Sequence, residues 1–241
     1  MITTLFFDLD GTLLPMDLEG FTTRYLQTIA KTMQPYGFEP KKLAAEIFQG
    51  VKVMTQHEEG ISNEEAFWQY FESLYGPSIR AQIPLFNQYY QNEFNLCKDT
   101  CPANPEIPGL IEKARELGFR VILATNPIFP RTAVESRLAW AGLKPEDFDF
   151  ITSYENSSFC KPDPRYFLQT ARAAGVNPDE VLMIGNDLNE DYGAIKAGMP
   201  LYILTDCLIE SETNSLDDLP HGSVKDLEVY LENLAASQKA D

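Results

Sequence analysis

Positive charge is scarce in this sequence. It contains 19 lysine and arginine residues against 36 aspartate and glutamate residues, so the formal net charge at pH 7 is −17. A surface of this sign repels the phosphates of nucleic acids and the headgroups of anionic lipids. We therefore expect neither nucleic acid nor a membrane surface as a partner.

Long apolar stretches are also missing. No apolar run is long enough to cross a bilayer, and the N-terminus lacks the basic and then apolar pattern of a signal peptide. The absence of both features predicts a soluble protein that stays in the cytoplasm.

Cysteine and histidine are too few and too scattered to suggest a disulfide framework or a zinc site. Cys97 and Cys101 lie in CKDTC, but no second pair of cysteines or histidines lies nearby to complete a metal site. His57 and His221 are isolated as well, and we expect His57 on the surface. All the cysteines are expected to be reduced thiols: Cys97, Cys101, Cys160 and Cys207.

A short apolar segment at the N-terminus precedes a long region with helical patterns. The run that ends at Phe6 and Phe7 predicts a strand buried on both faces, as in a parallel sheet. From about residue 15 to residue 102, apolar residues recur at helical spacing in four segments, which predicts the core of a four-helix bundle. The predicted apolar stripes include Phe48 and Leu74. Ser62 followed by Glu65 predicts a capping box at the third helix.

Strands and helices alternate from about residue 104 onward. This alternation predicts an α/β fold, a Rossmann-like doubly wound parallel sheet with helices on both faces. Residues 206–223 are expected to form an acidic loop and residues 224–234 a terminal helix. The predicted strands of this part are residues 120–124, 148–152, 181–185 and 201–204.

The two patterns divide the chain into two parts. We expect residues 1–15 and 103–241 to form the sheet domain, and residues 16–102 to form an all-helical cap domain inserted after the first strand. Proline and polar residues cluster near both crossings, which favours hinges there.

Residues with useful chemistry follow the ends of four predicted strands. Ligands of open parallel sheets bind beyond the carboxyl ends of the strands, so these side chains should converge on one site. In chain order they are Asp8 and Asp10, Thr125 and Asn126, Lys161, and Asn186 with Asp187.

The residue types in this set favour phosphoryl transfer. Four aspartates, with Asp191 as the last, offer only oxygen ligands, which suit a hard cation such as Mg²⁺. Lys161 and the Thr125 hydroxyl can donate hydrogen bonds to an anionic oxygen. A carboxylate beside such donors can attack phosphorus, while a second carboxylate moves protons.

Four segments resemble, in order and spacing, the motifs of the haloacid dehalogenase superfamily. The segments are DLDGT at 8–12, ATN at 124–126, KPDP at 161–164 and GNDLNED at 185–191. The resemblance covers nearly the whole chain and includes a helical cap between the first and second motifs. It implies a capped phosphatase similar to phosphoglycolate phosphatase or β-phosphoglucomutase.

The resemblance also implies a role for each matching residue. Asp8 corresponds to the nucleophile and to a Mg²⁺ ligand, and Asp10 to the general acid and base, whose backbone carbonyl also binds the metal. Lys161 corresponds to the lysine that steadies nucleophile and phosphate. The residues expected to bind phosphate are Gly11, Thr125, Asn126 and Lys161.

The fourth motif departs from the family pattern, because Asn186 stands where an acid usually follows the glycine. Family members commonly have the pattern GDxxxxD or GDxxxD. The spacing from Asn186 to Asp191 matches the longer pattern, and the spacing from Asp187 to Asp191 matches the shorter one. An amide oxygen can bind Mg²⁺ but adds no charge. We therefore favour Asp187 as the direct ligand and expect Asp191 to act behind it or through a water.

These roles predict a Mg²⁺-dependent phosphatase that hydrolyses a small phosphorylated metabolite through an aspartyl-phosphate. Asp10 argues against a dehalogenase, because carbon–halogen cleavage has no leaving oxygen to protonate. A phosphomutase of the β-phosphoglucomutase type would share every core residue and remains an alternative. A binding domain without catalysis is a third reading, which the intact Asp8, Asp10 and Lys161 disfavour.

Substrate choice is expected to depend on residues 15–22 and on the helical segment. Arg24, Gln56 and Asn63 are its candidate polar groups, and they form no pattern that indicates a particular substrate. We expect the protein to be a monomer or a homodimer.

Overall fold

A single parallel sheet forms the centre of the computed structural model, which describes residues 1–57 and 60–238. The strands lie in the order β3-β2-β1-β4-β5-β6, and every neighbouring pair is parallel. The strands are β1 Thr4–Phe7, β2 Arg120–Leu123, β3 Phe150–Ile151, β4 Val181–Gly185, β5 Leu201–Leu204 and β6 His221–Gly222. The α/β fold expected from the sequence is confirmed.

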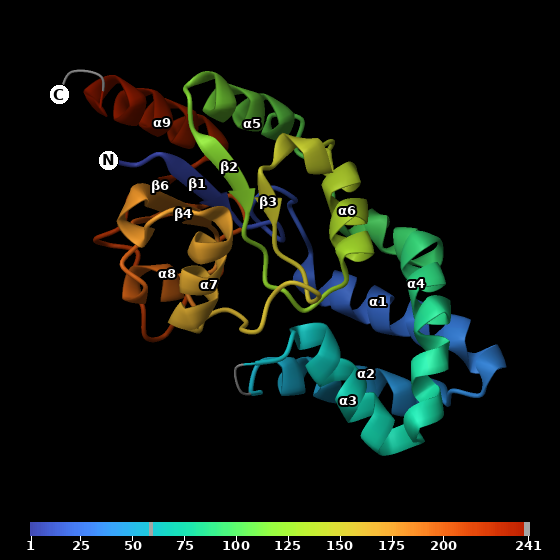
Figure 1. Cartoon of the computed structure of the whole chain (residues 1–241). Helices are drawn as coiled ribbons and strands as arrows, with labels where there is room; N and C mark the ends of the chain where they lie inside the picture. The colour runs from blue at the N-terminus through green and yellow to red at the C-terminus, as the bar shows by residue number, and fades with distance from the viewer. Residues whose placement is uncertain (58–59, 239–241) are drawn as a thin grey trace.

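Helices cover both faces of this sheet (Figure 1). Because side chains alternate along a strand, Leu5 and Phe7 pack on one face and Phe6 on the other. The first face is covered by α5 (Ile107–Glu116), α6 (Arg131–Trp140) and α9 (Val224–Gln238), and the second by α7 (Pro164–Ala174) and α8 (Gly193–Lys196). The doubly wound arrangement follows from this alternation.

Helices alone fill the described part of the region between β1 and α5. They are α1 (Leu18–Met33), α2 (Pro40–Met54), α3 (Asn63–Tyr75) and α4 (Ile83–Gln91), followed by a 3₁₀ segment, Glu93–Thr100. Aromatic rings form much of their core; Phe71, for example, stacks on Phe67 with centroids 4.5 Å apart. We propose that residues 16–102 are a cap domain, and we call this region the cap.

Three local expectations were wrong. Phe48 and Leu74 are 66% and 43% exposed, so neither belongs to the buried stripe of its helix. Ser62 accepts a hydrogen bond from the Glu65 backbone, but the Glu65 side chain pairs with Arg80 instead of closing the capping box. The expected loop at 206–223 contains β6, which pairs with β5.

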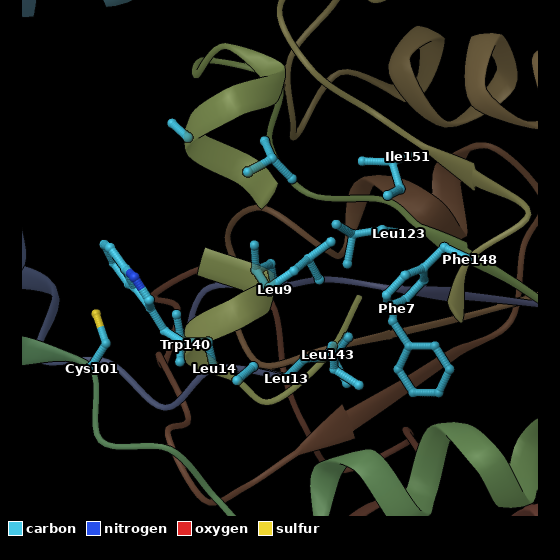
Figure 2. Close-up of a cluster of buried hydrophobic side chains, with 14 of the residues drawn as sticks. Phe7, Leu9, Leu13, Leu14, Cys101, Leu123, Trp140, Leu143, Phe148 and Ile151 are labelled. Carbon is cyan, nitrogen blue, oxygen red and sulfur yellow. The ribbon is translucent and has the colours of Figure 1, made fainter. Parts of the chain in front are cut away.

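The loop after β1 is held by the apolar core beneath it. Leu9, Leu13 and Leu14 are fully buried, and Figure 2 shows them gathered beside Trp140 of α6 and Leu123 at the end of β2. Leu9 lies between the two aspartates of DLDGT, and Leu13 and Leu14 directly follow the motif. The loop that carries Asp8 and Asp10 is therefore fixed by packing on its other side.

No helix among the described residues combines the length and the apolar character needed to cross a membrane.

Candidate active site

The strand order reverses at β1, which lies in the middle of the sheet. The chain passes to β2 and β3 on one side and then returns to β4 on the other. Ligands of such sheets bind where the strand order reverses, beyond the carboxyl ends of the strands. Asp8 follows β1 directly, and its backbone N–H donates to the Ile184 carbonyl of β4 at 2.9 Å. The two motifs at these strand ends therefore lie side by side.

Lys161 is the electrostatic centre of the site. Its ammonium donates to Asp8 Oδ1 and to Asp191 Oδ1, each at 2.7 Å, and its side chain is completely buried. Burial alone would lower the pKa of Lys161, but the carboxylates of Asp191 and Asp8 hold it well above its usual range. Burial raises the pKa of Asp8 to about 7, although Lys161 opposes this rise. One cation therefore holds two buried carboxylates.

Asp191 organises the loop after β4. Its second oxygen, Oδ2, accepts the backbone N–H groups of Asn186 and Asp187, both at 3.1 Å. The carboxylate lies so close to Gly185 that a Cβ there would overlap it. Both oxygens of Asp191 are thus engaged in hydrogen bonds within the site.

Asn186 links its own motif, GNDLNED, to the DLDGT motif by a hydrogen bond. Its Oδ1 accepts the Thr12 hydroxyl at 2.9 Å, and its Nδ2 donates to the Cys207 carbonyl at 2.7 Å. Gly11 faces this amide with φ at +86°, and a Cβ at Gly11 would overlap Asn186. A glycine is therefore required by both the backbone conformation and the close approach.

Thr125 and Asn126 lie at the end of β2. Thr125 is buried, and its backbone carbonyl accepts the hydroxyls of Thr152 and Tyr166, each at 2.8 Å. Its own hydroxyl makes no hydrogen bond with any described residue and lines the cavity. Asn126 accepts the Lys161 backbone N–H at 3.3 Å. The structure thus brings together all the residues expected from the strand ends.

Arg137 is a site residue that the sequence reasoning missed. It lies on α6 with a fully buried side chain, and its guanidinium pairs with Asp10 Oδ2. The same guanidinium lies over the Phe129 ring, 4.5 Å from its centre. Asp10 Oδ1 and Arg137 Nη2 are buried without a partner among the described residues. The available signal was an arginine three residues after Val134, on the same face of α6 as Val134 and Leu138.

Glu190 was also missed. It accepts a hydrogen bond from Asn126 Nδ2 at 2.9 Å and lines the cavity. Its enclosure by protein raises its pKa to about 8, even though Lys161 lies nearby. Its place in the fourth motif, next to Asp191, was the available signal.

The cavity above these residues has a volume of about 230 Å³. The sheet domain supplies the polar floor, and the cap supplies much of the wall. The acidic residues of the floor are Asp8, Asp10, Asp187, Glu190 and Asp191. The polar candidates of the cap lie elsewhere: Gln56 is exposed, Arg24 is 4.0 Å from Asp99, and Asn63 is buried against the Pro127 carbonyl at 2.9 Å.

The free oxygens of the floor suit Mg²⁺. Asp8 and Asp187 each keep one oxygen, Oδ2, that accepts no hydrogen bond from the described residues, so each carboxylate retains lone pairs for a metal or a substrate. No three acidic, histidine or cysteine side chains in the described part of the chain converge on one metal position. Mg²⁺ commonly takes one or two carboxylates and completes its shell with water, so the arrangement fits this ion.

A model of the haloacid dehalogenase-like hydrolase family matches residues 2–198. The chain belongs to this family. It is 26% identical over 224 residues to the glyceraldehyde 3-phosphate phosphatase of Methanothermobacter thermautotrophicus. The alignment covers 90% of this chain and 92% of the relative.

Solved structures of the family share the fold. The HAD phosphatase from Thermococcus onnurineus superposes with a TM-score of 0.57 at 20% identity, covering 95% of this chain and 98% of that one. L-2-haloacid dehalogenase from Xanthobacter autotrophicus gives the same score at 15% identity, covering 97% and 100%. A phosphatase and a dehalogenase fit the fold equally well, so the reaction of this hydrolase must be argued from its site.

Proposed function

We propose that this protein is a Mg²⁺-dependent phosphatase of small phosphorylated metabolites, and that Asp8 carries the phosphoryl group as a covalent intermediate. One observation carries the proposal: the buried Lys161 ammonium holds Asp8 at the floor of the cavity, 2.7 Å away, with Asp10 two residues further along the loop. The relative from Methanothermobacter, named a phosphatase, supports the same reaction class.

The contacts assign a task to each group. Asp8 Oδ1 is bonded to Lys161, so Oδ2 is the oxygen placed to attack phosphorus, while Oδ1 keeps a lone pair with which Asp8 would also bind Mg²⁺. As the bond from Oδ2 to phosphorus forms, the ester oxygen leaves and takes a proton from Asp10. Asp10 then accepts a proton from the water that attacks the acyl phosphate, and Asp8 is regenerated with release of inorganic phosphate.

Other residues hold the phosphate and the metal. The Thr125 hydroxyl and Lys161 donate to the phosphate oxygens. Asp8 and Asp187, with an amide or carbonyl oxygen of Asn186 or Asp10, would hold Mg²⁺, which offsets the negative charge of the phosphate and the carboxylates.

Turnover of p-nitrophenyl phosphate tests this function. We expect activity in the parent with Mg²⁺, none after chelation by EDTA, and a loss of roughly 10⁴-fold or more in Asp8→Asn. Asp179→Asn removes an exposed carboxylate that precedes β4, at the opposite end of that strand from the fourth motif, and does not line the cavity, so it should retain full activity. An inactive parent, or an active Asp8→Asn, would contradict the proposal.

The intermediate and the alternatives need two further readouts. Mass spectrometry after a rapid acid quench should find a phosphate adduct on the peptide that contains Asp8. Release of inorganic phosphate without a sugar bisphosphate primer would support a hydrolase, whereas a strict need for such a primer would indicate the phosphomutase.

A further inference from the structure

The wall of the active-site cavity is almost entirely apolar. Its apolar residues come from α1, from α2, from the loop after β2 and from the segment after β5. They are Leu18, Phe21, Tyr25 and Leu26, then Ile47, Phe48 and Val51, then Ile128 and Phe129, and finally Ile209. Among the described residues, Thr22 is the only other cap residue in this wall. The part of a substrate beyond its phosphate would therefore contact apolar side chains.

Cations are absent from the cavity lining among the described residues. The two cations beneath the floor are both engaged, since Lys161 pairs with Asp8 and Asp191, and Arg137 pairs with Asp10. A carboxylate or a second phosphate on the substrate would find no partner in the wall. It would also approach the five acidic residues of the floor, which makes such a substrate unfavourable.

Hydrogen-bonding groups for a sugar are equally scarce in the wall. The Tyr25 hydroxyl is paired with the Tyr90 hydroxyl at 2.7 Å inside the cap, and only 7% of Tyr25 is exposed. In the part of the cap that the structure describes, Thr22 is left as the one polar side chain that lines the cavity with an unpaired hydroxyl. A polyhydroxy substrate would lose its hydration there without replacement bonds, which disfavours sugar phosphates.

The apolar wall continues into the cap. A second cavity of about 30 Å³ shares Ile47, Val51 and Phe129 with the first. Its remaining lining includes Ile29, Phe67 and Phe86, which are core residues of the cap. Apolar side chains therefore continue behind the wall into the core of the cap.

Two large apolar side chains line the cavity and are also open to solvent. Leu18 is 53% exposed and Phe48 is 66% exposed, one on each of two cap helices. Water contact at such side chains is unfavourable, so a ligand that covers them gains affinity. A mainly apolar substrate explains why these positions are not polar.

We propose that the substrate is the monophosphate ester of a mainly apolar alcohol, aliphatic or aromatic, without a second charged group. This inference rests on the proposed phosphatase function. The floor recognises the phosphate, and the apolar wall recognises the rest.

A series of ethyl, butyl and hexyl phosphate tests the substrate class, because the leaving alcohols differ little in reactivity. We expect kcat/KM to rise about three- to fourfold for each added methylene until the cavity is filled. Phosphoglycolate and glycerol 3-phosphate should both be poorer substrates than butyl phosphate. A flat series, or a preference for either polar ester, would overturn the inference while leaving the phosphatase function intact. No turnover of any ester, p-nitrophenyl phosphate included, would instead refute the function itself.

Phe48→Lys tests whether the apolar wall causes the preference for longer alkyl chains. The position is exposed, so the change should not prevent folding. We expect it to reduce the rise from ethyl to hexyl phosphate at least tenfold and to improve phosphoglycolate relative to butyl phosphate. Leu74→Lys is the matched control, an exposed apolar residue of the cap outside the cavity lining, and it should keep the parent's series. An unchanged series in Phe48→Lys, or an equal change in Leu74→Lys, would reject the assignment to this wall.

Discussion

The floor and the wall of the cavity differ in the kind of side chain that they contain. The floor buries charge: Lys161 is fully enclosed between Asp8 and Asp191, and Arg137 is fully enclosed against Asp10. The cap wall presents apolar side chains, and the hydroxyl of its one described tyrosine, Tyr25, bonds to Tyr90 inside the helical core. Buried ion pairs are fragile to the loss of one partner, whereas an apolar surface tolerates small changes. Substitutions should therefore act strongly at the floor and weakly in the cap.

Lys161→Met should have one of the two largest effects on stability. It leaves two buried carboxylates without their cation, so we expect the free energy of unfolding to fall by about 3–5 kcal/mol. Urea denaturation measures this, with the exposed Lys144→Met as control. A loss below about 1 kcal/mol would show that the two carboxylates do not depend on Lys161, against the usual cost of an unpaired buried charge.

The pair of Asp10 and Arg137 should respond asymmetrically. Asp10→Asn leaves a fully buried guanidinium unpaired and should cost about 3–5 kcal/mol of stability. Arg137→Met should cost less, about 1–3 kcal/mol, because the Asp10 side chain is 27% exposed and can reach water. The double variant should be more stable than Asp10→Asn alone.

Activity separates a positioning role of Arg137 from a purely structural one. Arg137 touches Asp10 and does not line the cavity, so Arg137→Met should lower kcat about 10-fold or more with little change in KM. Equal stability losses in the two single variants, or a change confined to KM, would count against this account.

The metal should distinguish two aspartates of the same loop. Asp187→Asn is expected to weaken Mg²⁺ binding roughly 10- to 100-fold with little loss of stability. Asp191→Asn should mainly destabilise the fold, because Asp191 accepts hydrogen bonds from Lys161 and from two backbone N–H groups. Calorimetric titration with Mg²⁺ and urea denaturation give the two readouts. Loss of affinity in Asp191→Asn alone would reverse the assignment.

Tyr90→Phe should have the smallest effect and probes the cap. It removes one hydroxyl of the pair with Tyr25, so we expect a stability loss of about 1 kcal/mol. Because the pair lies behind the wall, kcat/KM for hexyl phosphate should stay within about twofold of the parent value. A large loss of activity would mean that the hydroxyl pair takes part in substrate binding.

The local sequence pattern was enough to predict four of the strands and the motif residues at their ends. The apolar runs at β1, β2, β4 and β5 are short and continuous, and parallel strands deliver their carboxyl ends to one edge. β6 escaped prediction because its two residues, His221 and Gly222, have no apolar pattern and owe their conformation to pairing with β5. Phe48 fits a helical stripe by spacing, yet no element of the fold covers it.

The sequence by itself determined the sheet, the helical insertion and the polar residues at the strand ends, because periodicity and motif spacing are local properties of the chain. Only the tertiary structure decided that Arg137 pairs with Asp10, 127 positions away, and that Lys161 joins Asp8 to Asp191. The apolar wall was likewise invisible in the sequence, because the same side chains serve equally well in a helical core. Which of them face a cavity depends on how α1 and α2 lie over the strand ends, and long-range packing alone sets that arrangement.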